Sequence, residues 1–241
     1  VLHHVPSGVL NPRAMNVIGP GMIVDPITCI EEIEGLRARG VEDLSRRLVI
    51  DRGCHLILPV HRQLDAAREA ATDGRIGTTK RGIGPCWEDL VGRRGVRIGP
   101  PEDFDRLPES LREKAALLRE LGQTPPTLDE VVEPVREALE RLAPFVGDAR
   151  GAISDALTRG GRVLFEGAQG TFLDPLHGTY PFVTSSPPTT SYALHSLGVP
   201  PQTIGDVWGV AKMYDTYVGT KSFQPESGPF EKLRELGGEY G

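Results

Sequence analysis

The sequence has few cysteines, no long apolar run and no excess of positive charge, and each shortage excludes a class of protein. Its three cysteines, Cys29, Cys54 and Cys86, are odd in number and far apart, whereas zinc sites and disulfide frameworks use close pairs. No apolar run approaches the length of a membrane span, and the start Val1-Leu2-His3-His4 has no signal-peptide pattern. We therefore expect reduced thiols, no membrane segment and a cytoplasmic protein.

The net charge of −6 and the pI near 5.6 argue against a general binder of nucleic acid or acidic membranes, because such proteins need a basic surface. The Walker pattern Gly-x-x-x-x-Gly-Lys-Ser/Thr is also absent. What is present is an ordinary globular composition, 39% hydrophobic and 25% charged over 241 residues. Since we find no repeats and no low-complexity linker, we expect residues 1–241 to form a single domain.

Short apolar runs alternate with helical patterns along the chain, which predicts an α/β fold of three layers: a mostly parallel central sheet with helices on both faces. Asp25 suits the N-cap and Pro26 the first position of a helix that ends before Gly40. The expected strands are 17–18, 23–24, 47–50, 56–58, 163–165 and 203–204 with 207–211, and the expected helices include 26–39, 64–71 and 189–197.

Between residues 101 and 159 the composition changes to charged helix formers with Leu and Ala. Leu111, Ala115 and Leu118 have helical spacing, and Pro125-Pro126 separate them from a second amphipathic pattern. We expect a helical hairpin packed on the sheet, with its charges on a solvated face rather than at a partner site. The polar tail after Gly219 shows no pattern of a closing helix or strand.

The run 162–174, Arg-Val-Leu-Phe-Glu-Gly-Ala-Gln-Gly-Thr-Phe-Leu-Asp, is typical of a strand that leads into a binding loop. Val163–Phe165 suits a strand buried on both faces, and the Gly, Ser and Thr residues that follow leave hydroxyls and N–H groups free. Open α/β sheets bind ligands at such strand ends, although ordinary surface loops have the same composition. Gln169 offers an amide whose burial would require a polar ligand or a backbone partner.

A second segment, 77–85, reads Gly-Thr-Thr-Lys-Arg-Gly-Ile-Gly-Pro and offers two hydroxyls and several unencumbered amides. Such groups hold phosphate, and Lys80 and Arg81 add charge. Arg93 and Arg94 follow a predicted helix, and a guanidinium can clamp phosphate bidentately. The alternative for this arginine pair is an ordinary solvent-facing surface.

Both segments, with His177-Gly-Thr-Tyr-Pro-Phe-Val-Thr-Ser-Ser186, closely resemble the nucleotide-binding part of adenylosuccinate synthetases. The resemblance implies a fold like that of P-loop NTPases, and it implies contacts with inosine monophosphate at five positions. These positions are Thr79, Arg93, Gln169, Leu173 and Thr184. The family's catalytic Asp and His lie upstream of the segment that Val1 begins, so we expect no catalytic or metal-binding residue here, Asp174 and His177 included.

The implied reaction joins L-aspartate to inosine monophosphate with GTP and Mg²⁺, giving adenylosuccinate in purine biosynthesis. In the family GTP and Mg²⁺ are bound mainly by regions outside the segment that this chain matches. The resemblance also implies a homodimer in which Arg93 reaches the neighbouring subunit's nucleotide. Because the chain begins with Val1 and ends on Gly-Gly-Glu-Tyr-Gly, we expect it to be the middle of a longer enzyme.

The sequence departs from the family pattern in two regions, 187–192 and 217–226. Pro187-Pro188-Thr189 replaces the usual residues after Ser186, and Tyr217 replaces an Arg. Two alternatives therefore stay open: a purine-nucleotide-binding regulatory protein without turnover, and a related ligase that uses another purine monophosphate. The departures bear on the partner nucleotide or amino acid more than on the fold.

Overall fold

The computed structural model describes residues 2–71, 76–99, 101–214, 216–217, 219 and 228–237. In the first half of the chain the elements are η1 (Ser7–Leu10), β1 (Asn16–Ile18), β2 (Ile23–Val24), α1 (Pro26–Ala38), α2 (Leu44–Arg47), β3 (Leu48–Asp51), β4 (His55–Leu56), α3 (Pro59–Ala71), α4 (Ile83–Val91), α5 (Pro101–Asp105) and α6 (Leu107–Glu120). They are followed by α7 (Leu128–Leu142), η2 (Ala143–Phe145), β5 (Val146–Gly147), α8 (Ala149–Thr158), η3 (Thr171–Leu173), α9 (Thr190–Leu197), η4 (Pro201–Thr203) and α10 (Gly228–Gly237).

The strands pair in parallel, as the alternation of strands and helices predicts, and they form two small sheets. One sheet has the order β1-β3-β5, with Val17 opposite Val49 and Ile50 opposite Val146. The other pairs β2 with β4, and the N–H of Ile57 extends its ladder by donating to the carbonyl of Val24 over 2.8 Å. Pro59, which has no N–H to give a ladder, starts α3 directly after this sheet.

The beginning of α1 follows its sequence signals. Asp25 caps it: one carboxylate oxygen accepts from the N–H groups of Ile27 and Thr28, and Pro26 occupies the first helical position. The same carboxylate forms an ion pair with Arg62 of α3, so the cap also connects α1 to α3.

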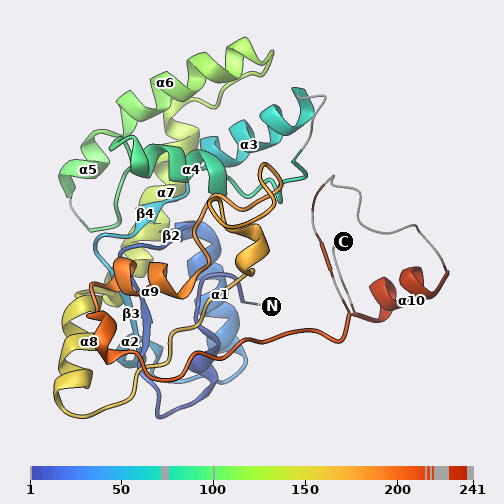
Figure 1. The fold of residues 1–241 in the computed structure, drawn as a ribbon. Coiled ribbons are helices and arrows are strands. Elements are labelled where there is room, and N and C mark those ends of the chain that lie inside the picture. The colour runs from blue at the N-terminus through green and yellow to red at the C-terminus, as the bar shows by residue number, and fades with distance from the viewer. Residues whose placement is uncertain are drawn as a thin grey trace.

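Helices flank the two small sheets (Figure 1), and two apolar cores lie between these elements. The first joins β1 and β3 to α1 and to the end of α7, through side chains such as Ile33, Ile50 and Leu142. The second joins β4 to α3, α6 and α7, with Leu118 and Val135 fully buried. Over the described ranges, no helix combines the length and the apolar character that crossing a bilayer requires.

The helical region expected at 101–159 is present. α6 and α7 form its hairpin, α5 precedes them and α8 closes the region. The Thr127 hydroxyl accepts from the N–H of Glu130 while the Glu130 carboxylate accepts from the N–H and hydroxyl of Thr127, a reciprocal cap that fixes the start of α7.

Two predicted buried strands are wrong. Residues 163–165 and 207–211 form no strand; Leu164 is 90% exposed and Val210 is 99% exposed. A strand buried on both faces requires neighbours that pair with its N–H and C=O groups, and no described segment supplies them. Apolar composition is typical of a buried strand but contains no information about the pairing partner that a strand requires.

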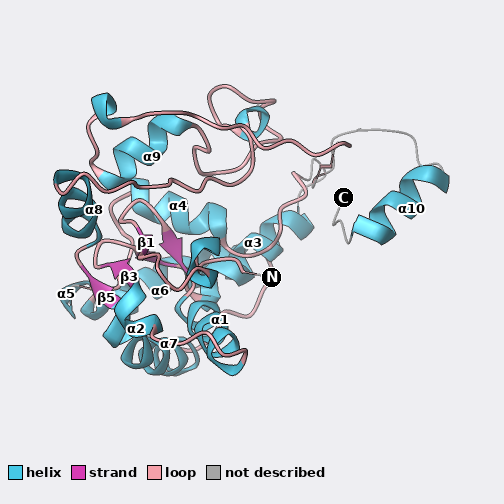
Figure 2. Cartoon of the chain, turned by 90° about the horizontal axis from the view of Figure 1, so that it is seen from below, coloured by secondary structure: helices cyan, strands magenta, loops and turns pink. Residues whose placement is uncertain are grey.

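The short helix expected near Thr189 is confirmed as α9, which lies among the long loops gathered on one side of the molecule (Figure 2). The expectation of no closing helix is wrong, because α10 forms close to the end, with Pro229 at its second position. Every residue of α10 is exposed and the helix stands apart from the main body in both views. Residues 220–226, where the sequence departs from the family, lie outside the described residues.

Candidate functional site

Thr79 lies in a loop that joins α3 to α4. Its side chain is exposed, as are those of Lys80 and Arg81, so the two cations predicted to add charge lie on the same open stretch of loop. Lys80 has a positive φ of 56° and Gly82 one of 78°, which turns the chain sharply into α4. The loop therefore presents a hydroxyl and two cations outward, the combination expected of a phosphate site.

Leu173 and Thr184 are brought together by a second loop, which folds back on itself. The N–H of Thr184 donates to the carbonyl of Leu173 over 2.9 Å, and the N–H of Thr179 donates to the carbonyl of Phe172 over 3.0 Å. Asp174 is buried and accepts from the N–H groups of Leu176 and His177 at 2.8 and 3.0 Å, which gives it a structural role. Both residues assigned to the nucleotide pocket are thus half-buried neighbours.

The second loop lies close to α4, the helix into which the first loop leads. A β-carbon on Gly84, in the first turn of α4, would lie 3.3 Å from the Ser185 hydroxyl, so the residue after Thr184 is close to the start of this helix. The ring of Trp87 on α4 also packs on that of Tyr192 on α9, with centroids 5.7 Å apart. Segments about a hundred residues apart in sequence are therefore adjacent at this point.

The tail of the chain returns to the same place. The hydroxyl of Tyr217 donates to the carbonyl of Phe182 over 3.3 Å, and a β-carbon on Gly219 would lie 2.9 Å from the carbonyl oxygen of Ile76. Tyr217, which stands where the family pattern has Arg, is thus connected to the loop that contains Thr184. This departure from the pattern lies beside the candidate site.

Gln169 and Arg93 are placed differently. The Gln169 side chain is exposed and makes no hydrogen bond within the described part of the chain, so the buried amide considered from the sequence is not observed. Arg93 follows the end of α4, with its N–H donated to Leu90 and its side chain exposed. No hydrogen bond or ion pair of the described residues connects either side chain to Thr79, Leu173 or Thr184.

Backbone strain is concentrated at these positions. Among described residues other than glycine, φ is positive at Asp43, Lys80, Arg93 and Gln169. A side chain in the left-handed region has a conformational cost, and such residues gather at functional sites. Two of the four are predicted nucleotide contacts and a third is adjacent to Thr79, which supports the choice of these loops.

The carboxylates that hold the first loop were missed by reasoning from the sequence. Asp65 of α3 accepts from the Thr78 hydroxyl and the Gly82 N–H, both at 2.9 Å, and Glu69 accepts from the Gly77 N–H at 2.7 Å. Their spacing of four places them on one face of the predicted helix, a signal that could have been used. Their target, a loop eight to seventeen residues ahead, could not be read from that spacing.

A buried polar cluster connects α3, α4 and α6 beneath the loop. The Leu58 N–H donates to Nδ1 of His61, so Nε2 bears the hydrogen and donates to Asp89 over 3.1 Å. Lys114 donates to the same Asp89 oxygen over 2.5 Å and to the Ser110 hydroxyl over 2.9 Å. Burial alone would raise the pKa of Asp89, but the hydrogen bonds from His61 and Lys114 outweigh it and hold that pKa below its usual value.

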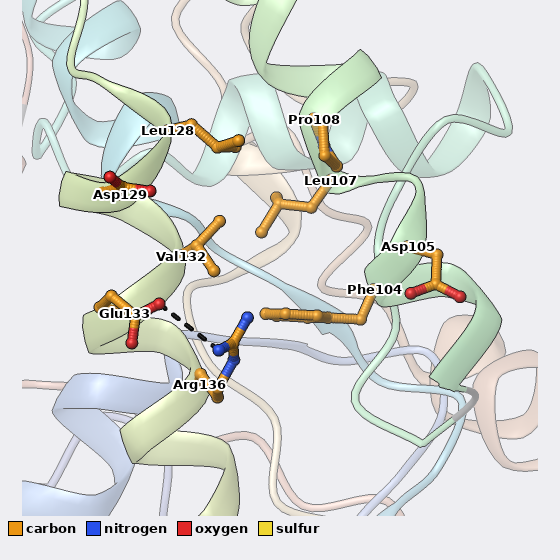
Figure 3. A pocket seen from close by; sticks show the side chains of 9 residues that line it. All are labelled: Phe104, Asp105, Leu107, Pro108, Leu128, Asp129, Val132, Glu133 and Arg136. Atoms are coloured by element: carbon orange, nitrogen blue, oxygen red, sulfur yellow. Dashed lines mark ion pairs between the residues drawn. The ribbon is translucent and has the colours of Figure 1, made fainter.

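A separate hollow of about 280 Å³ lies between α5, the start of α6 and the start of α7 (Figure 3). Apolar side chains such as Leu107 and Val132 form its base, and the Arg136 guanidinium lies over the Phe104 ring, 6.0 Å from its centroid. None of the five predicted nucleotide contacts lines it. The described residues also contain no group of three or more His, Cys, Asp or Glu side chains that could hold a metal ion.

Comparison with known proteins decides which family this chain belongs to. Residues 1–241 match the family model of adenylosuccinate synthetase over their full length. The chain belongs to the adenylosuccinate synthetase family.

Two curated family members illustrate the similarity. The adenylosuccinate synthetase of Sorangium cellulosum is 47% identical over all of this chain, and that of Trichlorobacter lovleyi is 43% identical. This chain covers 58% of each of those relatives. The chain therefore spans a little over half the length of the family members that it matches.

A solved family structure matches the fold. The fully ligated adenylosuccinate synthetase from Plasmodium falciparum aligns with the whole chain and with 57% of its own, at 31% identity and a TM-score of 0.87. The predicted α/β class, with parallel strands flanked by helices and a P-loop-like fold, is confirmed.

Low pH should decrease the stability of the folded protein through the titration of His61. Burial lowers the pKa of His61, so the unfolded chain binds a proton near pH 6.5 that the folded chain does not. Stability should therefore fall below about pH 6.5, by at most about 1.4 kcal/mol per pH unit for this group. The Gln side chain of His61→Gln keeps a donor toward Asp89 but does not titrate. We predict that this variant reduces the slope of the free energy of unfolding against pH, by an amount equivalent to up to about one bound proton, when urea unfolding is measured between pH 7.5 and 5.5.

The control is His195→Gln, because His195 is exposed on α9. Some slope should remain in His61→Gln, since burial also lowers the pKa of His4 and His55. An unchanged slope in His61→Gln would show that His61 does not titrate as its burial requires.

Proposed function

We propose that this chain forms the inosine-monophosphate pocket of an adenylosuccinate synthetase, which joins L-aspartate to inosine monophosphate with GTP in purine biosynthesis. The observation that carries the proposal is the close approach of the Thr184 loop, at Ser185, to Gly84 at the start of α4, the helix into which the Thr79 loop leads, in a chain of this family. Two hydroxyl-bearing loops from distant parts of the sequence then face one ligand.

Each proposed contact has a chemical role. Thr79 and Thr184 donate hydroxyl hydrogens to the phosphate, and Lys80 and Arg81 contribute positive charge beside Thr79. The Gln169 amide, with both donor and acceptor, binds the polar edge of the nucleotide, and Leu173 forms an apolar wall. Gln169 makes no hydrogen bond to other described residues, so its amide is free to meet a ligand.

The reaction proposed for the whole enzyme has two steps. The γ-phosphoryl group of GTP passes to the 6-oxygen of the purine, leaving GDP, and the aspartate amine then attacks C6 and releases phosphate. Bound Mg²⁺ neutralises phosphate charge in such transfers. We assign to this chain only the binding and orientation of the acceptor nucleotide.

We assign no general base or nucleophile to this chain, and Asp174 illustrates the reason, since it is buried and one of its carboxylate oxygens accepts from two backbone N–H groups. Binding that stabilises substrate and transition state equally does not accelerate chemistry. The 241 residues should thus bind nucleotide without turnover. We further propose that they form one domain and that the protein acts in the cytoplasm.

Arg93 is proposed to act across a dimer. Its side chain is exposed just beyond the end of α4, and no hydrogen bond or ion pair of the described residues connects it to the two loops. A guanidinium that serves a neighbouring subunit's phosphate has this placement.

The pocket can be tested by comparing inosine monophosphate with inosine, which lacks the phosphate. We predict that Thr79→Val and Thr184→Val each weaken inosine monophosphate binding about tenfold, because one charge-assisted hydrogen bond is lost. Inosine affinity should change little. Isothermal titration calorimetry measures both, with Thr158→Val on α8 as a matched control whose affinities should equal those of the unaltered chain.

Equal losses for both ligands would place the two threonines away from the phosphate. No inosine monophosphate binding by the unaltered chain would overturn the pocket itself.

The dimer can be tested by mixing two defective variants. We predict that Arg93→Leu and Gln169→Ala each lower inosine monophosphate affinity about ten- to hundredfold. After subunit exchange, about one quarter of all sites should regain full affinity, because random pairing in a two-fold dimer leaves one intact site in each hybrid. If no site recovers although exchange is demonstrated by mass, Arg93 serves its own chain or no nucleotide.

A further inference from the structure

The loop that contains Thr79 is docked lengthwise on one face of α3. Its contacts fall at residues 61–62, 65 and 69 of the helix, which are one turn apart along a single stripe. The loop therefore takes its shape from α3, which is itself buried in the second apolar core through Val60, Leu64 and Ala67.

Asp65 holds both ends of the tightest part of this loop. One carboxylate oxygen accepts from the Thr78 hydroxyl and the other from the Gly82 N–H, each at 2.9 Å. Asp65 is only 7% exposed, so these bonds are sheltered from water. Thr78 and Gly82, which lie two positions before and two positions after Lys80, are thus both fixed to the buried Asp65 carboxylate.

The end of the loop is held at Gly82, where its backbone lies close to that of α3. A β-carbon there would lie 2.8 Å from the Arg62 nitrogen and 2.9 Å from the His61 carbonyl carbon, so the loop backbone touches the helix backbone directly. Its φ of 78° also disfavours any other residue. Glu69 completes the attachment by accepting from the Gly77 N–H at 2.7 Å.

Because of this attachment, some polar groups of the loop are bonded to α3 and others remain exposed. The Thr78 hydroxyl and the Gly77 and Gly82 N–H groups are used on the helix side, whereas Thr79, Lys80 and Arg81 remain exposed. Without the attachment, either threonine hydroxyl could turn toward a ligand and the loop would have to be ordered on binding, which costs affinity.

We propose that Asp65 is the positioning residue of the phosphate loop: it fixes Thr78 and Gly82 so that Thr79 is presented to the phosphate of the nucleotide. This inference rests on the proposed function, because it names the group that pre-orders that site. Asp65 itself does not touch the ligand.

The experiment measures the phosphate increment, defined as the ratio of inosine monophosphate affinity to inosine affinity. Asp65→Ala removes both hydrogen bonds and should reduce this ratio about tenfold. Asp65→Asn should stay within about threefold of the unaltered chain, since its carbonyl can accept from Gly82 while its amide donates to the Thr78 hydroxyl. Thr78→Val, which removes one bond, should fall between them.

Several outcomes overturn the inference. An unchanged ratio in a folded Asp65→Ala would do so, as would a loss in Asp65→Asn as large as in Asp65→Ala, because the carboxylate charge rather than its hydrogen bonds would then matter. A purely structural role would weaken both ligands alike and leave the ratio intact. Asp155→Ala, on an exposed part of α8, controls for loss of one negative charge. If Asp65→Ala does not fold, Asp65→Asn and Thr78→Val decide.

A ligand-free measurement separates this inference from the proposed function. The Gly82 N–H is bonded to Asp65, so its hydrogen exchange should become at least about tenfold faster in Asp65→Ala and stay slow in Asp65→Asn. Slow exchange in Asp65→Ala contradicts the positioning role even if the chain binds nucleotide. If Gly82 exchanges fast in Asp65→Ala but the unaltered chain binds no nucleotide, the attachment of the loop by Asp65 is supported and the proposed nucleotide pocket is contradicted.

Discussion

The attachment of the 77–82 loop to α3 is the constraint on which the rest of the site depends. A Gly- and Thr-rich loop has little structure of its own, and here a helix with carboxylates one turn apart supplies it. Since Gly82 must contact the α3 backbone, the loop has one route into α4. That route places Gly84 against Ser185 and so positions the second loop, in which Thr184 and Leu173 are already joined by a backbone hydrogen bond.

The buried cluster of His61, Asp89 and Lys114 supports this arrangement from below. It connects the helix that holds the loop to the helix that leaves it, and α6 adds a buried cation. A buried carboxylate with two donors is strongly held: removing Lys114 would take away the buried cation that pairs with Asp89, and removing His61 would take away one of the two hydrogen bonds. Stability and site geometry are therefore coupled: the same α4 whose inner side bears Asp89 has Arg93 just beyond its end. A change in the protonation of His61 acts at the base of the site.

Local signals in the sequence were sufficient for local structure. Asp25 and Pro26 begin α1 as expected, and the segment with the second motif lies close to the helix that follows the first motif. Non-local information was missing wherever a prediction was wrong. Leu164 has the side chain of a buried strand and yet is exposed, because no described segment pairs with it, and pairing is not encoded in the run itself. Asp65 was overlooked for the same reason: its spacing with Glu69 is visible, whereas the loop that it holds is defined only by the fold.

The central claim is that two loops distant in sequence bind one nucleotide. The most direct test is a nuclear magnetic resonance titration of the uniformly ¹⁵N-labelled chain with inosine monophosphate. The account predicts that the amide resonances of Thr79, Gln169 and Thr184 shift together along one binding curve, while that of Val132, in the hollow beside α7, stays in place. Shifts of Thr79 and Thr184 with different dissociation constants, or a response of Val132 without either threonine, would contradict a shared pocket.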